Sequence, residues 1–347
     1  MAFYVIHAKA FAGQQILKVN PIYLSFQRYW TSLSLLIFFF DGSIINKPLC
    51  YLEEGLRRGI HIDVFIFMQD FFCAKLYAND DYKPCSKCLD SLMNAFVCPL
   101  IPKNKEYLKL FIKQYERKQL KKLLSRVNHV ITSTDEQIDF FVRFGVPKIN
   151  CYKMPLPFIM NKTICDNTSR GNYLVGIAQN RIEKGFQFVP EIMRQTRNTK
   201  LVLAYYNEDA ANKAKKIPGI TDLISCGKLE VVVASWKTGL SDLVAKSGGV
   251  IIPSIWPTTT EYGLLETMFF LKPIVAFNIG IHKENMREEK HGFFANVGDL
   301  KLFAQKMDLL STCSSGEYNE MQKHIQILYQ DMTDMNILEN HLKQLIS

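Results

Sequence analysis

Short apolar runs alternate with amphipathic segments through the second half of the chain. The runs are rich in β-branched residues and span residues 173–178, 201–206, 230–236, 249–253, 273–277 and 291–297. Segments with helical spacing lie between them, after Gly185, at 209–215, at 240–246 and from Asp299 onward. This alternation predicts an α/β fold, a parallel sheet with helices on both of its faces.

The first half of the chain has a similar but less regular pattern. Apolar runs at 35–40, 63–68 and 130–132 alternate with helical segments near 49–58, 105–126 and 135–144. The polar stretch 161–171 reads as a linker. We therefore predict a Rossmann-like domain over 1–160, a second one over 171–315, and a helix over 316–347 that packs back across the domain boundary. Two parallel sheets facing one another would form an interdomain cleft, which is a preferred place for a ligand.

Composition agrees with a globular protein of two domains. The chain has 347 residues, of which 48% are hydrophobic and 22% are charged. The N-terminal sequence lacks the pattern of a signal peptide, and the most apolar run, 33–40, is far shorter than the roughly 20 residues that cross a bilayer. We therefore expect a cytoplasmic protein with reduced thiols.

Four of the nine cysteines are close together in the sequence: Cys73, Cys85, Cys88 and Cys98. Cys85 and Cys88 form a C-x-x-C pair, which is a spacing that a structural zinc site uses. The outer spacings fit no common zinc finger, and only one C-x-x-C pair is present. We favour a loop with free thiols over a zinc cluster.

Positive charge is concentrated in the first half. Residues 1–160 hold 21 Lys and Arg against 13 Asp and Glu, whereas the remainder holds 21 against 20. Much of the excess lies in 103–126, which the spacing of its apolar residues predicts to be an amphipathic helix with a basic face. Such a face either is solvated or binds anionic lipid headgroups, giving peripheral membrane contact. Nucleic acid is not an expected partner, because no recognisable nucleic-acid module is present.

Common nucleotide motifs are absent from the sequence. No G-x-G-x-x-G follows a predicted strand, no G-x-x-x-x-G-K-[ST] is present, and no D-x-D pair offers a metal-bound sugar nucleotide its ligands. The stretch 253–277 reads instead as strand end, polar loop, helix start and new strand. That arrangement directs loop atoms and a helix N-terminus at one place, where α/β proteins receive charged ligands.

The second half resembles the donor-binding half of the retaining glycosyltransferases of family 4, which have the GT-B fold. The resemblance covers about residues 60–312 and is strongest from 171 onward. The matching features are Pro253-Ser254, Glu266, Lys272-Pro273-Ile274-Val275, Gly280, Glu284, His291-Gly292-Phe293 and Gly298-Asp299. Residues 173–192 and 129–157 are similar to earlier segments of the same family.

The resemblance implies a metal-independent glycosyltransferase that acts with retention of configuration. It would move a sugar from a UDP- or GDP-linked donor to a hydroxyl of a glycan, lipid-linked or protein acceptor, with no further cofactor. Arg181 and Lys184 would hold the diphosphate, where negative charge grows as the bond breaks, and Glu266 at a helix start would accept hydrogen bonds from the ribose. The predicted catalytic residues are Arg181, Lys184 and Glu261, and the predicted donor-binding residues are Thr258, Thr260, Glu261, Tyr262, Gly263 and Glu266.

Three departures from the family pattern affect this interpretation. The family has two glutamates with seven residues between them, and Thr258 stands at the first position; either Glu261 replaces it or the threonine hydroxyls contact the sugar. Two residues separate Arg181 from Lys184, where the family has four. The N-terminal sequence lacks a Gly-Gly loop, so the N-terminal domain is expected to be truncated or atypical.

Two other interpretations remain open. The first is a non-catalytic GT-B relative that binds a sugar nucleotide or a partner protein, which the atypical N-terminal domain and Thr258 suggest. The second is a GT-B phosphorylase or epimerase.

Overall fold

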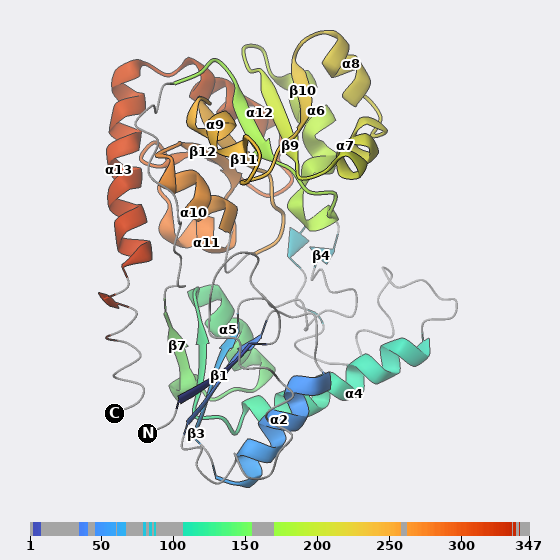
Figure 1. The fold of residues 1–347 in the computed structure, drawn as a ribbon, viewed down its shortest axis with the longest axis vertical. Coiled ribbons are helices and arrows are strands. Elements are labelled where there is room, and N and C mark those ends of the chain that lie inside the picture. The colour runs from blue at the N-terminus through green and yellow to red at the C-terminus, as the bar shows by residue number, and fades with distance from the viewer. Residues whose placement is uncertain are drawn as a thin grey trace. The chain divides into compact units, whose positions relative to one another are not determined.

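The computed structural model describes residues 3–7, 35–40, 46–59, 61–66, 79–80, 83–84, 87, 107–154, 170–257, 262–334, 336–337 and 340 (Figure 1). Contacts divide the chain into two compact units. The N-terminal unit comprises Met1–Asp80 and Cys85–Pro155, and the C-terminal unit comprises Asp81–Pro84 and Leu156–Ser347. Each unit has its own parallel sheet, and the short strands β4 (Asn79–Asp80) and β5 (Lys83–Pro84) pair separately.

The C-terminal unit contains a six-stranded sheet in the order β10-β9-β8-β11-β12-β13. Its strands are β8 (Leu174–Ile177), β9 (Leu201–Tyr205), β10 (Leu229–Val233), β11 (Gly249–Ile252), β12 (Ile274–Phe277) and β13 (Gly292–Ala295). All neighbouring strands are parallel. Each of the six apolar runs predicted from the sequence therefore forms a strand. The chain builds the sheet outward from β8 to β10 and then returns to place β11 on the other side of β8.

Helices cover both faces of this sheet, as the alternating pattern predicts (Figure 1). One face packs against α6 (Val189–Gln195), α7 (Glu208–Lys215), α8 (Ile220–Ser225) and α12 (Leu300–Thr312). The other face packs against α9 (Leu240–Ala245), α10 (Tyr262–Phe269) and α11 (Gly280–Asn285). Successive strand residues point to opposite faces, so Leu174 joins the first core and Val175 the second.

The long helix α13 (Ser315–Thr333) completes the C-terminal unit. A capping box starts it, since the Ser314 hydroxyl accepts from the Glu317 N–H and the Glu317 carboxylate accepts from the Ser314 N–H. Its inner side buries Tyr318, Met321 and Ile325. The predicted packing of 316–347 across the domain boundary stays a prediction.

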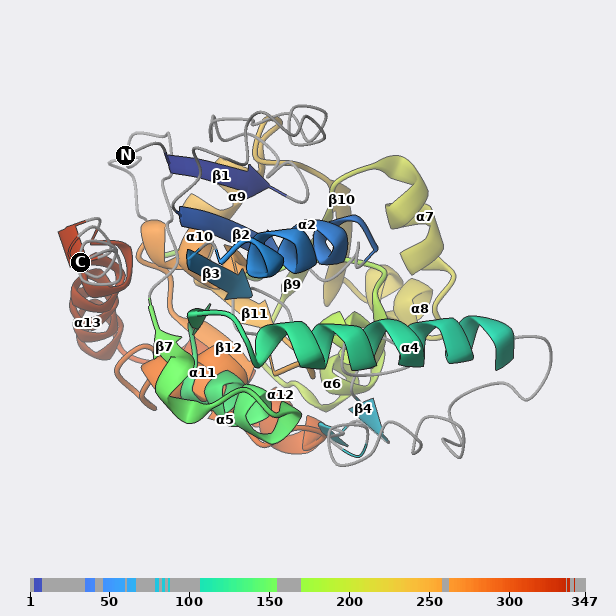
Figure 2. The same ribbon diagram turned by 90° about the horizontal axis from the view of Figure 1, so that it is seen from below.

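The N-terminal unit contains a five-stranded parallel sheet in the order β1-β2-β3-β6-β7. The strands are β1 (Phe3–His7), β2 (Leu35–Phe40), β3 (His61–Ile66), β6 (His129–Thr132) and β7 (Cys151–Lys153). The described helices are α2 (Asn46–Arg57), α4 (Tyr107–Leu124) and α5 (Asp135–Phe144). Side chains of all three helices pack into one core with Ile62, Val64 and Val130, so these helices cover one face of the sheet (Figure 2).

The described strands of the N-terminal unit follow one another across the sheet in chain order. No reversal of direction occurs among them, in contrast to the C-terminal sheet. Doubly wound sheets have such a reversal, and ligands bind beside it. The described strands of the N-terminal unit thus include no such switch point, and the truncated or atypical character of this domain stays a prediction.

The basic helix predicted over 103–126 is α4, and its described part shows which of its side chains are buried. Arg117 is buried, because it lies on the same stripe as the buried residues Leu120 and Leu124, three and seven positions later. Tyr115 lies off this stripe and is exposed.

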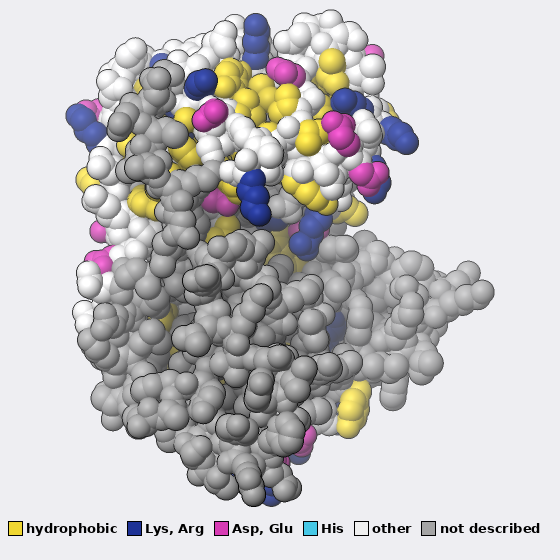
Figure 3. All heavy atoms as spheres, viewed as in Figure 1, with side chains coloured by type: hydrophobic (Ala, Val, Ile, Leu, Met, Phe, Trp, Pro, Cys, Tyr) yellow, Lys and Arg dark blue, Asp and Glu magenta, His cyan; other side chains and the backbone are white. Residues whose placement is uncertain are grey.

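Among the residues of the chain that can be described, no helix is long and apolar enough to cross a membrane. On the face of the C-terminal unit seen in Figure 3, Lys and Arg side chains are interspersed with Asp and Glu. This mixture agrees with the near-neutral balance of charge in residues 161–347. The four clustered cysteines, Cys73, Cys85, Cys88 and Cys98, lie outside the described residues.

Candidate functional site

The reversal of strand order in the C-terminal unit lies between β8 and β11. The connection after β8 leads to helices on one face of the sheet, and the connection after β11 leads to α10 on the other face. A crevice outside the carboxyl ends of two such strands is the usual ligand site of a doubly wound sheet. The predicted site residues lie in these two connections.

The two connections contact one another through their backbones. The carbonyl oxygen of Glu183, after β8, accepts hydrogen bonds from the Ser254 hydroxyl at 3.2 Å and from the Ile255 N–H at 3.0 Å. Ser254 and Ile255 follow β11, so these bonds fix the position of one connection against the other.

Gly185 makes this close approach possible. Its φ is +75°, and a Cβ atom placed on it would lie 1.8 Å from the carbonyl oxygen of Pro253. Only glycine meets both requirements, because any other side chain would be strained in that conformation and would collide with backbone. Gly185, which directly follows Lys184, therefore holds the two connections close together.

Arg181 and Lys184 lie at the two ends of the short segment between β8 and Gly185. Arg181 precedes a 3₁₀ turn formed by Ile182–Lys184, and its side chain is half exposed. Lys184 is half-buried at the end of that turn. Both cations thus belong to the connection that follows β8 at the switch point.

Glu183 is a residue of this site that the sequence did not reveal. Its carboxylate is buried and forms an ion pair with the Arg181 guanidinium. Within the described residues, neither of its carboxylate oxygens accepts a hydrogen bond. In the sequence, Glu183 is one polar residue between two cations, and nothing in that pattern indicates that it points inward.

Glu266 lies in α10, but its position in the helix differs from the prediction. The sequence pattern places Glu266 at the start of the helix, whereas the helix begins at Tyr262 and Glu266 is its fifth residue. Because the apolar residues Leu264 and Leu265 directly precede Glu266, the sequence pattern does not mark where the helix starts. The carboxylate is therefore one turn inside α10 and half-buried.

Tyr262 and Glu266 are one turn apart and lie on the same side of α10. Burial raises the pKa of the Tyr262 hydroxyl, and the nearby charge of Glu266 raises that pKa further. The Tyr262 hydroxyl is therefore neutral near pH 7 and able to donate a hydrogen bond. Gly263, also predicted as a contact, is in the first turn of the helix, where its carbonyl oxygen accepts from the Thr267 hydroxyl at 2.6 Å.

Thr258, Thr260 and Glu261 lie outside the described residues. Their predicted contacts with the sugar, and the choice between Glu261 and the threonines, stay predictions. That Lys184 and Glu266 bind one common ligand also stays a prediction. The connections that carry these two residues meet at Glu183 and Ser254.

Comparison with known families finds a match to the family described as "Glycosyl transferases group 1" over residues 173–312. The matched segment contains the whole six-stranded sheet and both connections at the switch point. A comparison with curated proteins finds no match.

Solved structures extend the comparison beyond residues 173–312 to most of the chain. Anabaena HepE in complex with UDP has a TM-score of 0.65 and 14% identity, covering 90% of this chain and 78% of that chain. Sucrose-phosphate synthase from Thermosynechococcus elongatus has a TM-score of 0.61 and 12% identity, covering 94% and 76%. A mutant of S. aureus TarM, in complex with Fondaparinux, alpha-GlcNAc-glycerol and UDP, has a TM-score of 0.61 and 15% identity, covering 90% and 55%.

These structures establish the fold of the chain. It is the α/β fold of the GT-B glycosyltransferases, with parallel sheets, as the sequence pattern predicts. The chain spans about half the length of the TarM chain that it resembles.

Proposed function

We propose that this protein is a glycosyltransferase that moves a sugar from a nucleotide-sugar donor to an acceptor hydroxyl. The observation that carries the proposal is the position of the group 1 domain match, 173–312, around the switch point between β8 and β11. Two cations, Arg181 and Lys184, and one carboxylate, Glu266, lie in the connections that meet there. Two solved structures of similar fold contain UDP and UDP-glucose, which supports a UDP-linked donor, with a GDP-linked donor as the alternative.

In this proposal, each side of the switch point binds one part of the donor. Lys184 and Arg181 neutralise the diphosphate, whose negative charge grows as the glycosidic bond breaks. Glu183 holds the Arg181 guanidinium in place through their ion pair. Glu266 accepts hydrogen bonds from the ribose hydroxyls, and the neutral Tyr262 hydroxyl donates to the same ligand.

The finer proposal is transfer with retention of configuration and without a metal ion. The departing diphosphate oxygen takes the proton of the acceptor hydroxyl while that hydroxyl attacks the same face of the sugar. The protein then contributes orientation and charge stabilisation, which Lys184 supplies on the leaving-group side. Transfer is expected to proceed without added Mg²⁺ or Mn²⁺, and the acceptor is a glycan, a lipid-linked sugar or a protein.

Donor binding and turnover test the proposal together. A screen of UDP- and GDP-sugars by thermal shift identifies the donor, because a ligand at 100 times its dissociation constant adds about 2.7 kcal/mol of stability. With that donor, Lys184→Ala and Glu266→Ala are each expected to lower turnover by ~10²-fold or more. Lys301→Ala and Glu208→Ala are matched controls, because both residues are exposed on helices, α12 and α7, that lie outside the two connections. Full turnover by Lys184→Ala or Glu266→Ala would overturn the site.

A non-catalytic relative is the second candidate. The strand order of the N-terminal unit favours it, because the described strands there have no reversal at which a second ligand would bind. Calorimetry separates the two candidates: a sugar nucleotide that binds but is neither transferred nor hydrolysed supports a binding subunit.

A further inference from the structure

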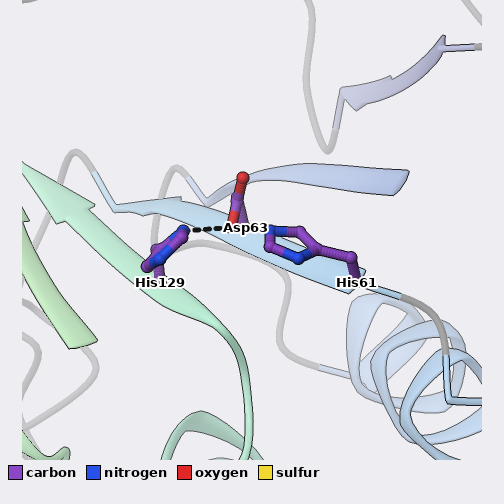
Figure 4. Close-up of side chains that lie close together, drawn as sticks. All are labelled: His61, Asp63 and His129. Carbon is purple, nitrogen blue, oxygen red and sulfur yellow. Dashed lines mark hydrogen bonds and ion pairs between the residues drawn. The ribbon is translucent and has the colours of Figure 1, made fainter. Parts of the chain in front are cut away.

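Two histidines and an aspartate meet on the sheet of the N-terminal unit (Figure 4). His61 and Asp63 belong to β3, and His129 belongs to the neighbouring strand β6. Their three side chains point toward one another in Figure 4. One ligand atom from each residue lies within 4.8 Å of the other two.

The sheet itself brings these residues together. His61 and Asp63 are two positions apart on one strand, so their side chains leave the same face. Asp63 is the direct partner of His129 in the parallel pairing of β3 with β6. The register is fixed beside the cluster, because the Asn128 side-chain oxygen accepts from the Ile62 N–H at 2.8 Å and the Asn128 N–H donates to the Ile62 carbonyl at 3.0 Å.

The cluster occupies the sheet face opposite the helical core. Ile62 and Val64, which alternate with the cluster residues along β3, point into the core formed with α2, α4 and α5. The cluster thus lies on the other face and is open to solvent through the histidines. The exposed fraction of the side chain is 35% for His61, 19% for His129 and 3% for Asp63.

Both imidazoles approach the same carboxylate oxygen. His61 Nε2 lies 3.0 Å and His129 Nδ1 lies 2.8 Å from Asp63 Oδ1. Zinc binds imidazole nitrogen and carboxylate oxygen at about 2.0–2.2 Å in tetrahedral geometry, which places ligand atoms about 3.3 Å apart. Small rotations of the side chains would therefore seat a zinc ion between the three atoms, with solvent at the fourth position.

The charge of the cluster also suits a cation. Asp63 is buried, and its only ion-pair partners among the described residues are the two imidazoles. A buried carboxylate is stabilised by a positive partner. A divalent ion would supply it, and two histidines with one carboxylate are a common ligand set for zinc. The Tyr152 ring packs edge-on against the His129 ring, 4.7 Å between centroids, and supports its orientation.

We propose that His61, Asp63 and His129 form a binding site for a divalent transition-metal ion, with Zn²⁺ the best match to their donor atoms. His61 is the first residue of β3 and His129 is the first residue of β6. The site is therefore at the amino ends of these strands, whereas ligands of parallel α/β sheets bind at the carboxyl ends. The ion would join β3 to β6 and stabilise the N-terminal unit, independently of donor chemistry.

Metal titration of the full-length chain tests this site. The protein is stripped with EDTA, dialysed, and titrated with Zn²⁺ by calorimetry and with Co²⁺ by absorption spectroscopy. We expect an ion bound by nitrogen and oxygen, seen as visible cobalt bands without thiolate-to-cobalt charge-transfer bands in the near ultraviolet. His61→Ala and His129→Ala should each weaken this binding at least ~10-fold, and His324→Ala, an exposed histidine of the C-terminal unit, should not.

Two further variants keep the result interpretable. Asp63→Asn preserves the size of the side chain and removes its charge, so a folded Asp63→Asn protein, checked by circular dichroism, should also lose affinity. A Cys85→Ser, Cys88→Ser double variant separates this site from the clustered cysteines and should bind the ion at the same affinity. The proposal is overturned if the wild type binds neither ion, if the histidine variants bind as tightly as the wild type, or if only the cysteine variant loses the ion.

Discussion

Glu183 is the residue at which the two sides of the switch point meet. Its backbone oxygen accepts two hydrogen bonds from the connection after β11, and its carboxylate pairs with Arg181. The short stretch of sequence between Arg181 and Lys184 thus contains a buried acidic residue, Glu183. Because Glu183 neutralises part of the Arg181 charge, Arg181 is expected to contribute less to the binding of a diphosphate than an arginine without an acidic partner would.

Lys272 offers a residue-scale prediction about pH. It is fully buried, its ammonium group donates to the Ser247 carbonyl at 3.0 Å, and burial lowers its pKa to about 8. Below ~pH 8 this lysine is charged in the folded and in the unfolded protein, and the folded protein bears the full free-energy cost of burying the charge. Between that pKa and the usual value of 10.5, the folded state releases its proton first, so this cost diminishes as the pH rises.

Lys272→Met measures the effect. Relative to this variant, the free energy of unfolding of the wild type should rise by about 2–3 kcal/mol between ~pH 7 and ~pH 10. Urea unfolding of both proteins at a series of pH values gives the difference. A difference that stays constant across that range would show that Lys272 keeps an ordinary pKa.

At the scale of elements, the sequence predicts all strands of the C-terminal sheet and some of its short helices. The six strands are buried runs of β-branched residues, so each is visible from composition alone. Six residues are fewer than two helical turns and give only a weak periodic signal: α9 lies in a segment predicted as helical, whereas α8 and α11, of the same length, do not. The sequence pattern also places Glu266 at the start of α10, whereas the helix begins at Tyr262.

The packing of α13 on the C-terminal unit gives an element-scale prediction. Ile325 faces the core and is fully buried, whereas Ile327, two positions later, is 58% exposed. Nearby, the Gln322 amide donates to the Leu271 carbonyl at 3.2 Å, and the Tyr329 ring contacts the Phe269 ring of α10. Ile325→Ala should lower the free energy of unfolding by about 2–5 kcal/mol. Ile327→Ala is the matched control and should change it by less than about 0.5 kcal/mol; equal effects in urea unfolding would show that α13 does not pack as described.

The basic helix α4 carries a second element-scale prediction. Lys118, Lys121 and Lys122 are exposed, whereas Arg117 of the same helix is buried. These three lysines are therefore the described cations on the solvent side of α4. If this face binds anionic headgroups at about 1 kcal/mol per cation, changing all three lysines to Glu should weaken binding by ~10²-fold or more. Co-sedimentation with phosphatidylserine vesicles measures this. The control changes Lys213, Lys215 and Lys216 of the α7 region to Glu, and equal losses in both proteins would rule out a specific role for α4.

At the scale of the whole molecule, sequence and structure contribute different parts of the two proposed sites. Arg181, Lys184 and Glu266 could be chosen from the sequence because they lie in stretches that resemble a known family. The metal site could not, since His61, Asp63 and His129 become neighbours only through the register that pairs Asp63 with His129. A distance of 66 residues along the chain separates that pair, and no local pattern encodes it.

Two ligands in two units should therefore act on separate parts of the chain, which hydrogen exchange can resolve. Bound nucleotide sugar should slow exchange in peptides that cover 178–188 and 253–269, because these carry the connections at the switch point. Bound Zn²⁺ should slow exchange in 61–66 and 128–132, where the ion joins β3 to β6. Each ligand is the control for the other. If donor binding slows exchange at 61–66 and has no effect at 178–188, the donor site is contradicted and the metal site is not. If Zn²⁺ slows exchange at 178–188 and has no effect at 61–66, the metal site alone is contradicted.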